Sequence, residues 1–184
     1  DLAVLELSLA TDDPLLETQP LREHELHWLV SRGHPLDRGR DATLAEIMDH
    51  RSVAASRMPP RILEPLLRAR RADGAGTRQI PWLVHPDLMM NVRLAKELGL
   101  VTALPLRLVR DELAAGTLVA IGHEPWMRTQ FGIALPRRLR SSAATAFAEV
   151  LAEVDARFVN EPSPQVSPTL EVVPGSTRKA RQHA

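Results

Sequence analysis

The stretch IPWLVHPDLMMNVRLAKELGLVTAL, residues 80–104, decides the fold class. Its two ends, Ile80 to Val84 and Val101 to Leu104, are apolar runs of strand length. Between them, Pro86 and Asp87 suit a helix start, because proline fits the first turn and a carboxylate favours the positive end of the helix dipole. The stretch therefore predicts a strand, a helix over 86–98 and a second strand. The apolar face of that helix repeats at i, i+4, i+7 and i+11, at Leu88, Val92, Ala95 and Gly99.

Five more apolar runs have strand length: Leu2 to Leu7, Leu26 to Val30, Ser52 to Ala55, Leu118 to Ile121 and Phe131 to Leu135. These runs are mostly continuous, whereas a half-exposed strand would alternate apolar and polar residues. They therefore indicate buried, largely parallel strands. Strands that alternate with helices predict an α/β layered domain, with ligand sites at the carboxyl ends of the strands.

Two further helices are marked by their ends. Thr43 and Glu46 form a capping box that predicts a short helix from Leu44 to about Asp49. The next helix is expected from about Leu106 to Ala114, and Gly116 should follow it in the left-handed conformation.

A last helix is expected from Ser141 or Ser142 to about Arg157, because either serine can cap it. Its predicted buried stripe consists of Phe147, Val150, Leu151 and Val154. Residues 159–184 hold four prolines, several serines and a basic end. Since this tail has no apolar face to bury, we expect it to be disordered.

Composition excludes several classes of protein. The 184 residues are 44% hydrophobic, enough for one ordinary core or two small joined ones. With 23 basic and 23 acidic residues the net charge is zero, which argues against direct binding to DNA. The absence of cysteine excludes disulfides, thiolate metal sites and cysteine nucleophiles. No apolar run approaches the roughly 18 residues of a membrane span, and no signal peptide is recognisable.

No motif predicts catalysis. The glycines of the 74–77 stretch lack the preceding strand and the lysine of a phosphate loop. His24 and His27 are three residues apart in an expected strand, whereas zinc-binding histidines of a zincin are four apart on a helix. No Gly-x-Ser-x-Gly elbow occurs. We therefore expect no catalytic residue, no metal and no cofactor, and no enzyme.

One stretch, Ala54 to Arg61, has the features of an anion site, because it joins an apolar strand to an apolar helical segment. A helix start offers free backbone N–H groups and a positive dipole end. Ser56 adds a hydroxyl, and Arg57 and Arg61 add positive charge. The two prolines of the stretch carry no N–H, so arginine would do more of the binding. Alternatively, the prolines only end the strand and the arginines are solvated.

Several short motifs occur in a fixed order along the chain: Asp1 to Val4, Pro20 to Val30, His34-Pro35-Leu36, Ala42 to Ile47, Val101 to Leu118, and Trp126 to Leu151. In this order they resemble the effector-binding domain of LysR-type transcriptional regulators. The similarity covers Asp1 to about Phe158. The resemblance rests on the order of the motifs along the chain, since no single motif is specific.

The resemblance implies an α/β fold of two Rossmann-like subdomains around a cleft, as in type 2 periplasmic binding proteins. Subdomain I would comprise residues 1–21 and 126–158, subdomain II residues 22–125, and the two crossings would form a hinge. By the same resemblance the chain is amino-terminally truncated. The helix-turn-helix, the linker helix and the first elements of subdomain I would lie upstream, so that subdomain I is incomplete.

The resemblance also implies ligand-binding residues in the cleft: Ser8, Ser56, Arg57, Met58, Arg61, His85 and Thr102. Ser56 with Arg57 is the leading pair. Structural alternatives remain, because Met58 can simply fill space, His85 can cap its helix or lie in solvent, and Thr102 can be an ordinary strand residue.

The leading hypothesis for function is the effector-sensing domain of a LysR-type regulator in the cytoplasm. A small organic anion, in particular a carboxylate, would shift the hinge and alter DNA binding by the helix-turn-helix of a homodimer or homotetramer. DNA would be contacted only through that domain, and no membrane would be involved. The alternative is a solute-binding protein of a bacterial transporter with the same fold. A helix-turn-helix upstream would support the first class and a signal peptide the second.

Overall fold

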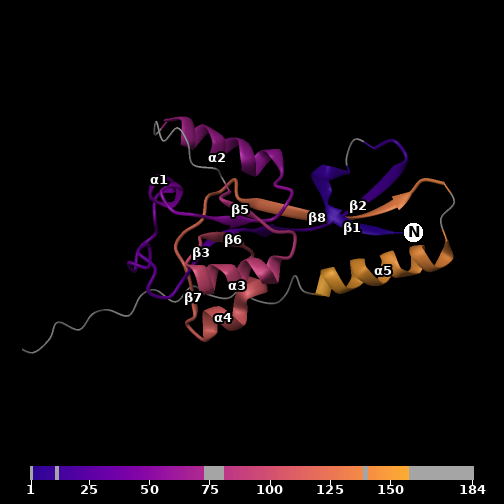
Figure 1. The fold of residues 1–184 in the computed structure, drawn as a ribbon. Coiled ribbons are helices and arrows are strands. Elements are labelled where there is room, and N and C mark those ends of the chain that lie inside the picture. The colour runs from indigo at the N-terminus through magenta and orange to yellow at the C-terminus, as the bar shows by residue number, and fades with distance from the viewer. Residues whose placement is uncertain (1, 11–12, 73–80, 139–140, 158–184) are drawn as a thin grey trace, which may run out of the picture.

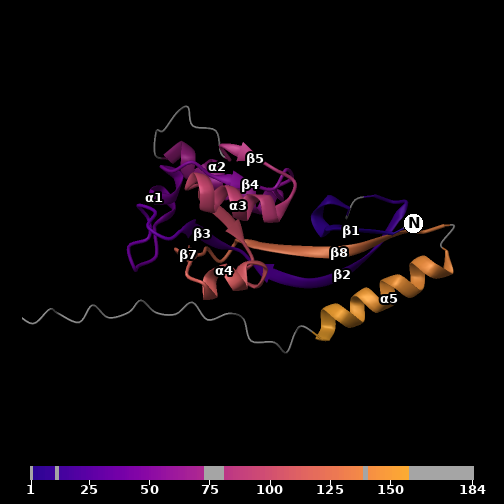
Figure 2. The same ribbon diagram turned by 60° about the horizontal axis from the view of Figure 1, so that its bottom comes forward.

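Three antiparallel strands and one helix form the smaller lobe of the protein, whose computed structural model describes residues 2–10, 13–72, 81–138 and 141–157 (Figure 1). The sheet has the order β1-β8-β2, and a short 3-10 turn, Leu7–Leu9, follows β1. Helix α5 lies along one face of this sheet (Figure 2). These elements span Ala3–Glu6 (β1), Leu16–Glu25 (β2), Arg128–Pro136 (β8) and Ser142–Arg157 (α5).

The larger lobe is built around an antiparallel sheet with the order β6-β3-β7. A parallel pair, β4 and β5, and a parallel bridge between Ser52 and Val101 extend it. The strands are His27–Ser31 (β3), Val53–Ala54 (β4), Leu83–Val84 (β5), Thr102–Leu104 (β6) and Leu118–Ala120 (β7). The helices are Leu44–Met48 (α1), Pro60–Ala72 (α2), Leu88–Leu98 (α3), the 3-10 turn Leu106–Val109 and Arg110–Ala114 (α4).

Strand β3 separates two hydrophobic clusters. Trp28 and Val30 belong to a cluster with residues of α1 and α2, whereas Leu29 belongs to a cluster with residues of α3 and β7. Successive side chains of a strand point to opposite faces of a sheet. Burial on both faces therefore accounts for the continuous apolar run of β3.

The prediction of largely parallel strands is wrong. The pairings β1·β8, β2·β8, β3·β6 and β3·β7 are antiparallel, and β4·β5 is parallel. The continuous apolar run of β3 is explained by burial on both faces, which carries no information about the direction of the neighbouring strand. The run Leu2 to Leu7 is not buried throughout, since Val4 on β1 is 50% exposed.

Strand β2 was absent from the strands predicted by apolar runs, because it is rich in polar residues and contains Pro20. It lies at the edge of its sheet, next to β8. Proline donates no N–H, and an edge strand has one side free of partners, so proline is tolerated there. The register between β2 and β8 shifts between Pro20 and Glu23, consistent with a local bulge.

The predicted buried stripe of the last helix is wrong for three of its four residues, and of the four Leu151 alone packs on the sheet. Phe147, Val150 and Val154 are 55%, 53% and 40% exposed. The helix packs on the sheet through Ala148 and its neighbours Ala144 and Leu151. On the same helix Asp155 accepts a hydrogen bond from the backbone N–H of Arg22 at 2.8 Å, so a polar contact helps to set which face meets β2.

Most helix ends agree with the sequence patterns, with two differences. Helix α3 begins at Leu88, so Pro86 lies before its N-cap and not in its first turn. The helix expected from Leu106 begins as a 3-10 turn before α4. The side-chain oxygen of Asp87 accepts from the N–H of Met89 at 2.8 Å and caps α3, which ends at Gly99 with φ of 59°. Gly116 has φ of 66° after α4. The Ser141 hydroxyl accepts from the N–H of Ala144 at 3.1 Å and caps α5. Ile80 and the predicted disordered tail, 159–184, lie outside the described residues.

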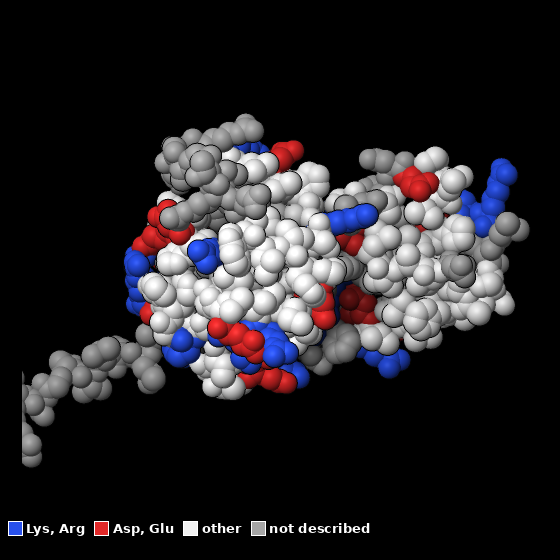
Figure 3. All heavy atoms as spheres, viewed as in Figure 1, with Lys and Arg blue, Asp and Glu red and all other residues white. Residues whose placement is uncertain are grey.

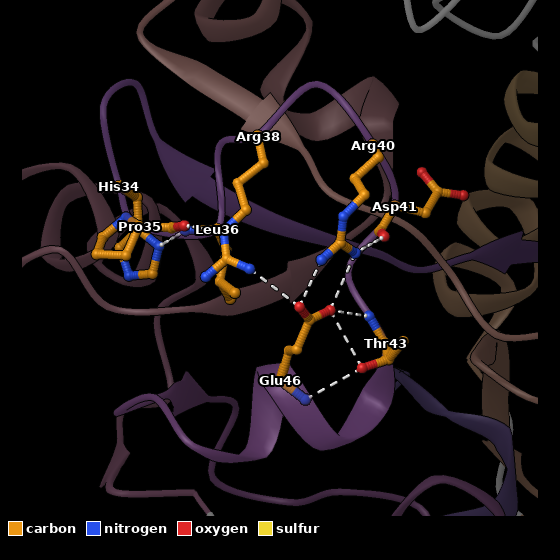
Figure 4. A network of polar contacts seen from close by, with 8 residues as sticks. All are labelled: His34, Pro35, Leu36, Arg38, Arg40, Asp41, Thr43 and Glu46. Carbon is orange, nitrogen blue, oxygen red and sulfur yellow. Dashed lines mark hydrogen bonds and ion pairs between the residues drawn. The ribbon is translucent and has the colours of Figure 1, made fainter.

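The capping box of α1 extends into a network around Glu46 (Figure 4). The Glu46 carboxylate accepts from the Thr43 N–H at 2.9 Å and from the Arg40 guanidinium at 2.6 Å. Arg38 donates to the same carboxylate at 3.0 Å. Hydrogen bonds from Arg40 and then from the Thr43 N–H lower the pKa of Glu46 from 4.5 to about 2. This network joins the 35–41 loop to the start of α1.

We expect Arg40→Gln to raise the pKa of Glu46 towards its ordinary value, because the strongest donor to the carboxylate is lost. Since the folded pKa is the lower one, the stabilisation is present above pH 4.5 and is lost as the pH falls through about 2. Carboxyl carbon shifts followed by NMR from pH 6 to about pH 1 would follow the titration of Glu46 in both proteins. A pKa of Glu46 that is the same in the variant would contradict this assignment.

Three histidines should make folding sensitive to mild acid. Burial is the main cause that lowers the pKa values of His24, His27 and His34. The His27 ring lies 4.9 Å from that of His123, and the His34 ring 4.8 Å from that of His50. The neighbouring ring lowers the pKa further in these two cases.

We therefore expect the free energy of unfolding to decrease between pH 7.5 and pH 5.5. The folded pKa values lie below the unfolded value near 6.5, so the unfolded chain binds more protons in this range. Urea denaturation at both pH values would measure the decrease, and His34→Gln should make it smaller. Equal or greater stability at pH 5.5 would contradict the expectation.

Candidate functional site

A cavity of about 140 Å³ lies where the two lobes meet. The larger lobe contributes most of its wall, from β4, the loop before α2, α2 and β6. The smaller lobe contributes Glu6 from β1 and Thr129 and Phe131 from β8. Figure 3 shows acidic and basic atoms together at the narrow junction of the lobes. The cavity therefore has walls from both parts of the fold.

An ion pair next to the cavity joins the lobes. The Glu6 carboxylate, on a residue 8% exposed, pairs through Oε1 with Nη2 of Arg61 on α2. Its Oε2 accepts from the backbone N–H of Ser8 at 3.1 Å and also from the Ser8 hydroxyl. Arg61 Nε donates to the backbone carbonyl of Arg128 at 3.0 Å. Both guanidinium contacts of Arg61 are thus made to strands of the smaller lobe, β1 and β8.

The structure brings two of the seven sequence-predicted residues, Arg57 and Met58, to the cavity wall. Met58 is half-buried, and Arg57 is exposed at the loop before α2. Arg57 has no hydrogen-bond or ion-pair partner among the residues that the structure describes. A guanidinium so placed can receive an anion at the mouth of the cavity.

The other five predicted residues lie off the wall. Ser8 and Arg61 are the partners of Glu6, and Ser56 is exposed beside Arg57. The Nδ1 of His85 accepts from the Asp87 N–H at 3.1 Å, at the entrance of α3. Thr102 is 1% exposed on β6, and its hydroxyl has no hydrogen-bond partner among the described residues. A ligand-binding role for these side chains stays a prediction.

Sequence reasoning missed Glu6 and the aromatic wall residues Trp28 and Phe131. Glu6 did carry a signal, because it is an acidic residue inside the apolar run Leu2 to Leu7. A carboxylate in such a run needs a partner when it is buried, which is a reason to look for an arginine elsewhere in the chain. The aromatic residues resemble ordinary core positions and gave no such signal.

The arrangement defines a class of protein: an α/β domain of two lobes with a ligand-sized cavity between them. A family model described as the LysR substrate binding domain matches residues 1–156. The chain therefore belongs to the LysR substrate-binding domain family. Its fold is the type 2 periplasmic-binding-protein-like α/β fold of that family. This assignment does not favour the alternative of a transporter's solute-binding protein.

Solved structures with the same fold include the effector binding domain of QuiR in complex with shikimate. That match has a TM-score of 0.61 and 21% identity, and it covers 85% of this chain and 72% of the other. The regulatory domain of MetR from Neisseria meningitidis has a TM-score of 0.61 and 18% identity, and the match covers 89% of this chain and 73% of the MetR chain. OxyR from Corynebacterium glutamicum has a TM-score of 0.58 and 13% identity, and the match covers 85% of this chain and 49% of the OxyR chain. At these identities the likeness shows the fold alone.

The chain spans about half the length of the OxyR structure that it matches, 49%. A search of curated proteins gave no match. Within the described ranges, no helix has the length and apolar character to cross a bilayer. Nor does that part of the chain place three histidine or carboxylate side chains where they could hold a metal ion.

Proposed function

We propose that this chain is the effector-sensing domain of a LysR-type transcriptional regulator and that its ligand is a small organic anion, in particular a carboxylate. The observation that carries the proposal is the cavity between the lobes, with Arg57 unpaired at its mouth among the described residues. Family membership supports the same role. In the QuiR structure a carboxylate-bearing ligand, shikimate, is bound to an effector domain of this fold.

The proposal includes two subdomains that move about a hinge. Residues 1–21 and 126–158 would form subdomain I and residues 22–125 subdomain II. In this division strand β2 contains the first crossing, between residues 21 and 22, and its neighbour β8 begins just after the second, between residues 125 and 126 (Figure 2). A ligand moves such an equilibrium only by binding one arrangement more tightly than the other. Contacts from both lobes to one ligand would provide that difference.

In the intact protein, we propose, this shift alters DNA binding by a helix-turn-helix domain elsewhere in a homodimeric or homotetrameric cytoplasmic regulator. This chain itself has a net charge of zero and is not expected to bind duplex DNA. Fluorescence anisotropy at low salt checks that expectation. Submicromolar binding that weakens steeply with added salt would contradict it.

Replacement of Arg57 by alanine should weaken binding of a carboxylate effector by about 1.5 to 3 kcal/mol, the usual range for a charge-assisted hydrogen bond. A thermal-shift screen of small carboxylates on the 184-residue chain would identify stabilising ligands, and calorimetry on the wild type and the variant would measure the loss.

Arg110→Ala is the matched control, because Arg110 is an exposed arginine on α4 and is absent from the cavity wall. It should bind the same ligands as the wild type. If the affinity of every stabilising carboxylate were the same in Arg57→Ala, the proposed site would be wrong.

A further inference from the structure

The cavity wall is mostly apolar. Its side chains include Trp28, Val53, Ile62, Ala103, Met127 and Phe131, drawn from both lobes. Its volume of about 140 Å³ is close to that of an engineered apolar cavity of roughly 150 Å³ that stays dry and binds benzene. The space is therefore sufficient for one six-membered ring, and its surface favours a ring without polar substituents.

Among the described residues, one charged side chain of the cavity wall, that of Arg57, is free to pair with a ligand. The wall has two charged side chains, Glu6 and Arg57. The Glu6 carboxylate forms an ion pair with Arg61 and accepts hydrogen bonds from Ser8. Its negative charge is therefore balanced, and both of its oxygens already have partners. Arg57 is exposed and has no such partner in the part of the chain that the structure describes.

Hydroxyl groups on the buried ring would be unfavourable. Ser52 and Thr129 are the hydroxyl residues of the wall. A polar group that leaves water without a replacement hydrogen bond costs free energy, whereas burial of an apolar ring in such a wall is favourable. A ligand with several hydroxyls would need more partners than this wall provides.

We propose that the cavity is selective for an amphipathic monoanion, with one unsubstituted aromatic ring or a similarly compact apolar body inside and a carboxylate on a short arm at Arg57. This inference rests on the proposed function, because it takes the cavity to be the effector site. It adds the chemical class of the effector and the residues that select it: Arg57 for the charge and the apolar wall for the body.

The test is isothermal titration calorimetry of the full chain with a matched set of probes. Benzoate, phenylacetate and 3-phenylpropionate share the ring and the charge and differ in the length of the arm. Benzyl alcohol retains the ring without the charge, acetate retains the charge without the ring, and shikimate has a hydroxylated ring with a carboxylate. We expect at least one arylcarboxylate to bind at least tenfold more tightly than each of the three controls.

Two variants separate the contribution of the charge from that of the apolar wall. Arg57→Gln should weaken binding of the best arylcarboxylate at least tenfold, because the carboxylate loses its partner. It should leave the affinity for benzyl alcohol within about twofold, because that probe uses only the ring site. Ala103→Val should weaken both, because it reduces the space for the ring. Arg110→Gln, off the wall, should change neither. Melting curves check that each variant is folded, and Arg57 is exposed, so its replacement leaves the core intact.

The other outcomes are distinct. If shikimate or acetate binds as tightly as the arylcarboxylates, and Arg57→Gln weakens it, the ligand class is wrong and the effector site stands. If no arylcarboxylate binds at 10 mM, the class is also wrong, and the thermal-shift screen then decides the proposed function. If arylcarboxylates bind and neither Arg57→Gln nor Ala103→Val changes their affinity, both the class and the site are wrong.

Discussion

Replacement of Leu29 by alanine should lower the free energy of unfolding by about 2 to 5 kcal/mol, the range for truncating a fully buried leucine. Leu29 is 0% exposed and lies at the centre of β3, between β6 and β7. The alanine leaves a cavity in the cluster formed with Val92, Leu104 and Leu118. Equilibrium denaturation in urea would measure the loss.

Leu98→Ala is the matched control, because Leu98 is 58% exposed at the end of α3. A surface substitution of this kind usually changes stability by less than about 0.5 kcal/mol. If both variants lost the same amount, Leu29 would not have the central position in the core that the structure gives it.

Replacement of Glu6 by alanine should cost about 2 to 4 kcal/mol of folding free energy. Removal of one partner of a fully buried ion pair costs roughly 3 to 5 kcal/mol, and the effect is smaller here because the Arg61 side chain is 38% exposed. The variant leaves Arg61 without its carboxylate and Ser8 without its acceptor. The contact between the lobes is thereby weakened.

Glu23→Ala provides the comparison for Glu6→Ala, since Glu23 pairs with Arg128 and both side chains are 45% exposed. Exposed pairs of this type contribute at most about 1 kcal/mol. Urea denaturation of both variants would separate the two cases. A cost for Glu6→Ala as small as that for Glu23→Ala would mean that the Glu6–Arg61 pair does not hold the lobes together.

The helices were predicted well because their ends depend on local chemistry. The capping box of Thr43 and Glu46 needs residues three apart, and the same holds for Ser141 and Ala144. Gly99 and Gly116 end helices with positive φ, a conformation that glycine adopts without a steric cost. Each of these signals lies within a few residues of the end that it predicts.

Strand direction and the orientation of α5 depend on residues far apart in the sequence, so local patterns did not predict them. Ile133 on the central strand β8, for example, pairs with Val4 of β1 on one side and with Gln19 of β2 on the other. The apolar stripe of α5 suggested burial of Phe147, whereas the helix packs through Ala148, where a small side chain allows a close approach to the sheet.

Two of the seven predicted ligand-binding residues, Arg57 and Met58, reach the cavity wall, and their binding role stays a prediction. Arg57 and Met58 belong to one loop, and the strand-to-helix pattern around them was visible in the sequence. Glu6 and Phe131 reach the cavity through the pairing of β1 with β8, residue 6 opposite residue 131. That register is a property of the folded chain, and no spacing in the sequence encodes it.

The central claim is that a ligand in this cavity changes the arrangement of the lobes, and a distance between the lobes tests it most directly. The chain has no cysteine, so Glu64→Cys on α2 and Glu149→Cys on α5 would place one spin label in each lobe. The distance distribution would be recorded by pulsed electron paramagnetic resonance, with and without a saturating amount of the strongest stabiliser from the thermal-shift screen. We predict that the ligand shifts the distribution and that Arg57→Ala requires a higher ligand concentration for the same shift. An identical distribution at saturation, in a protein shown by calorimetry to have bound the ligand, would contradict the claim.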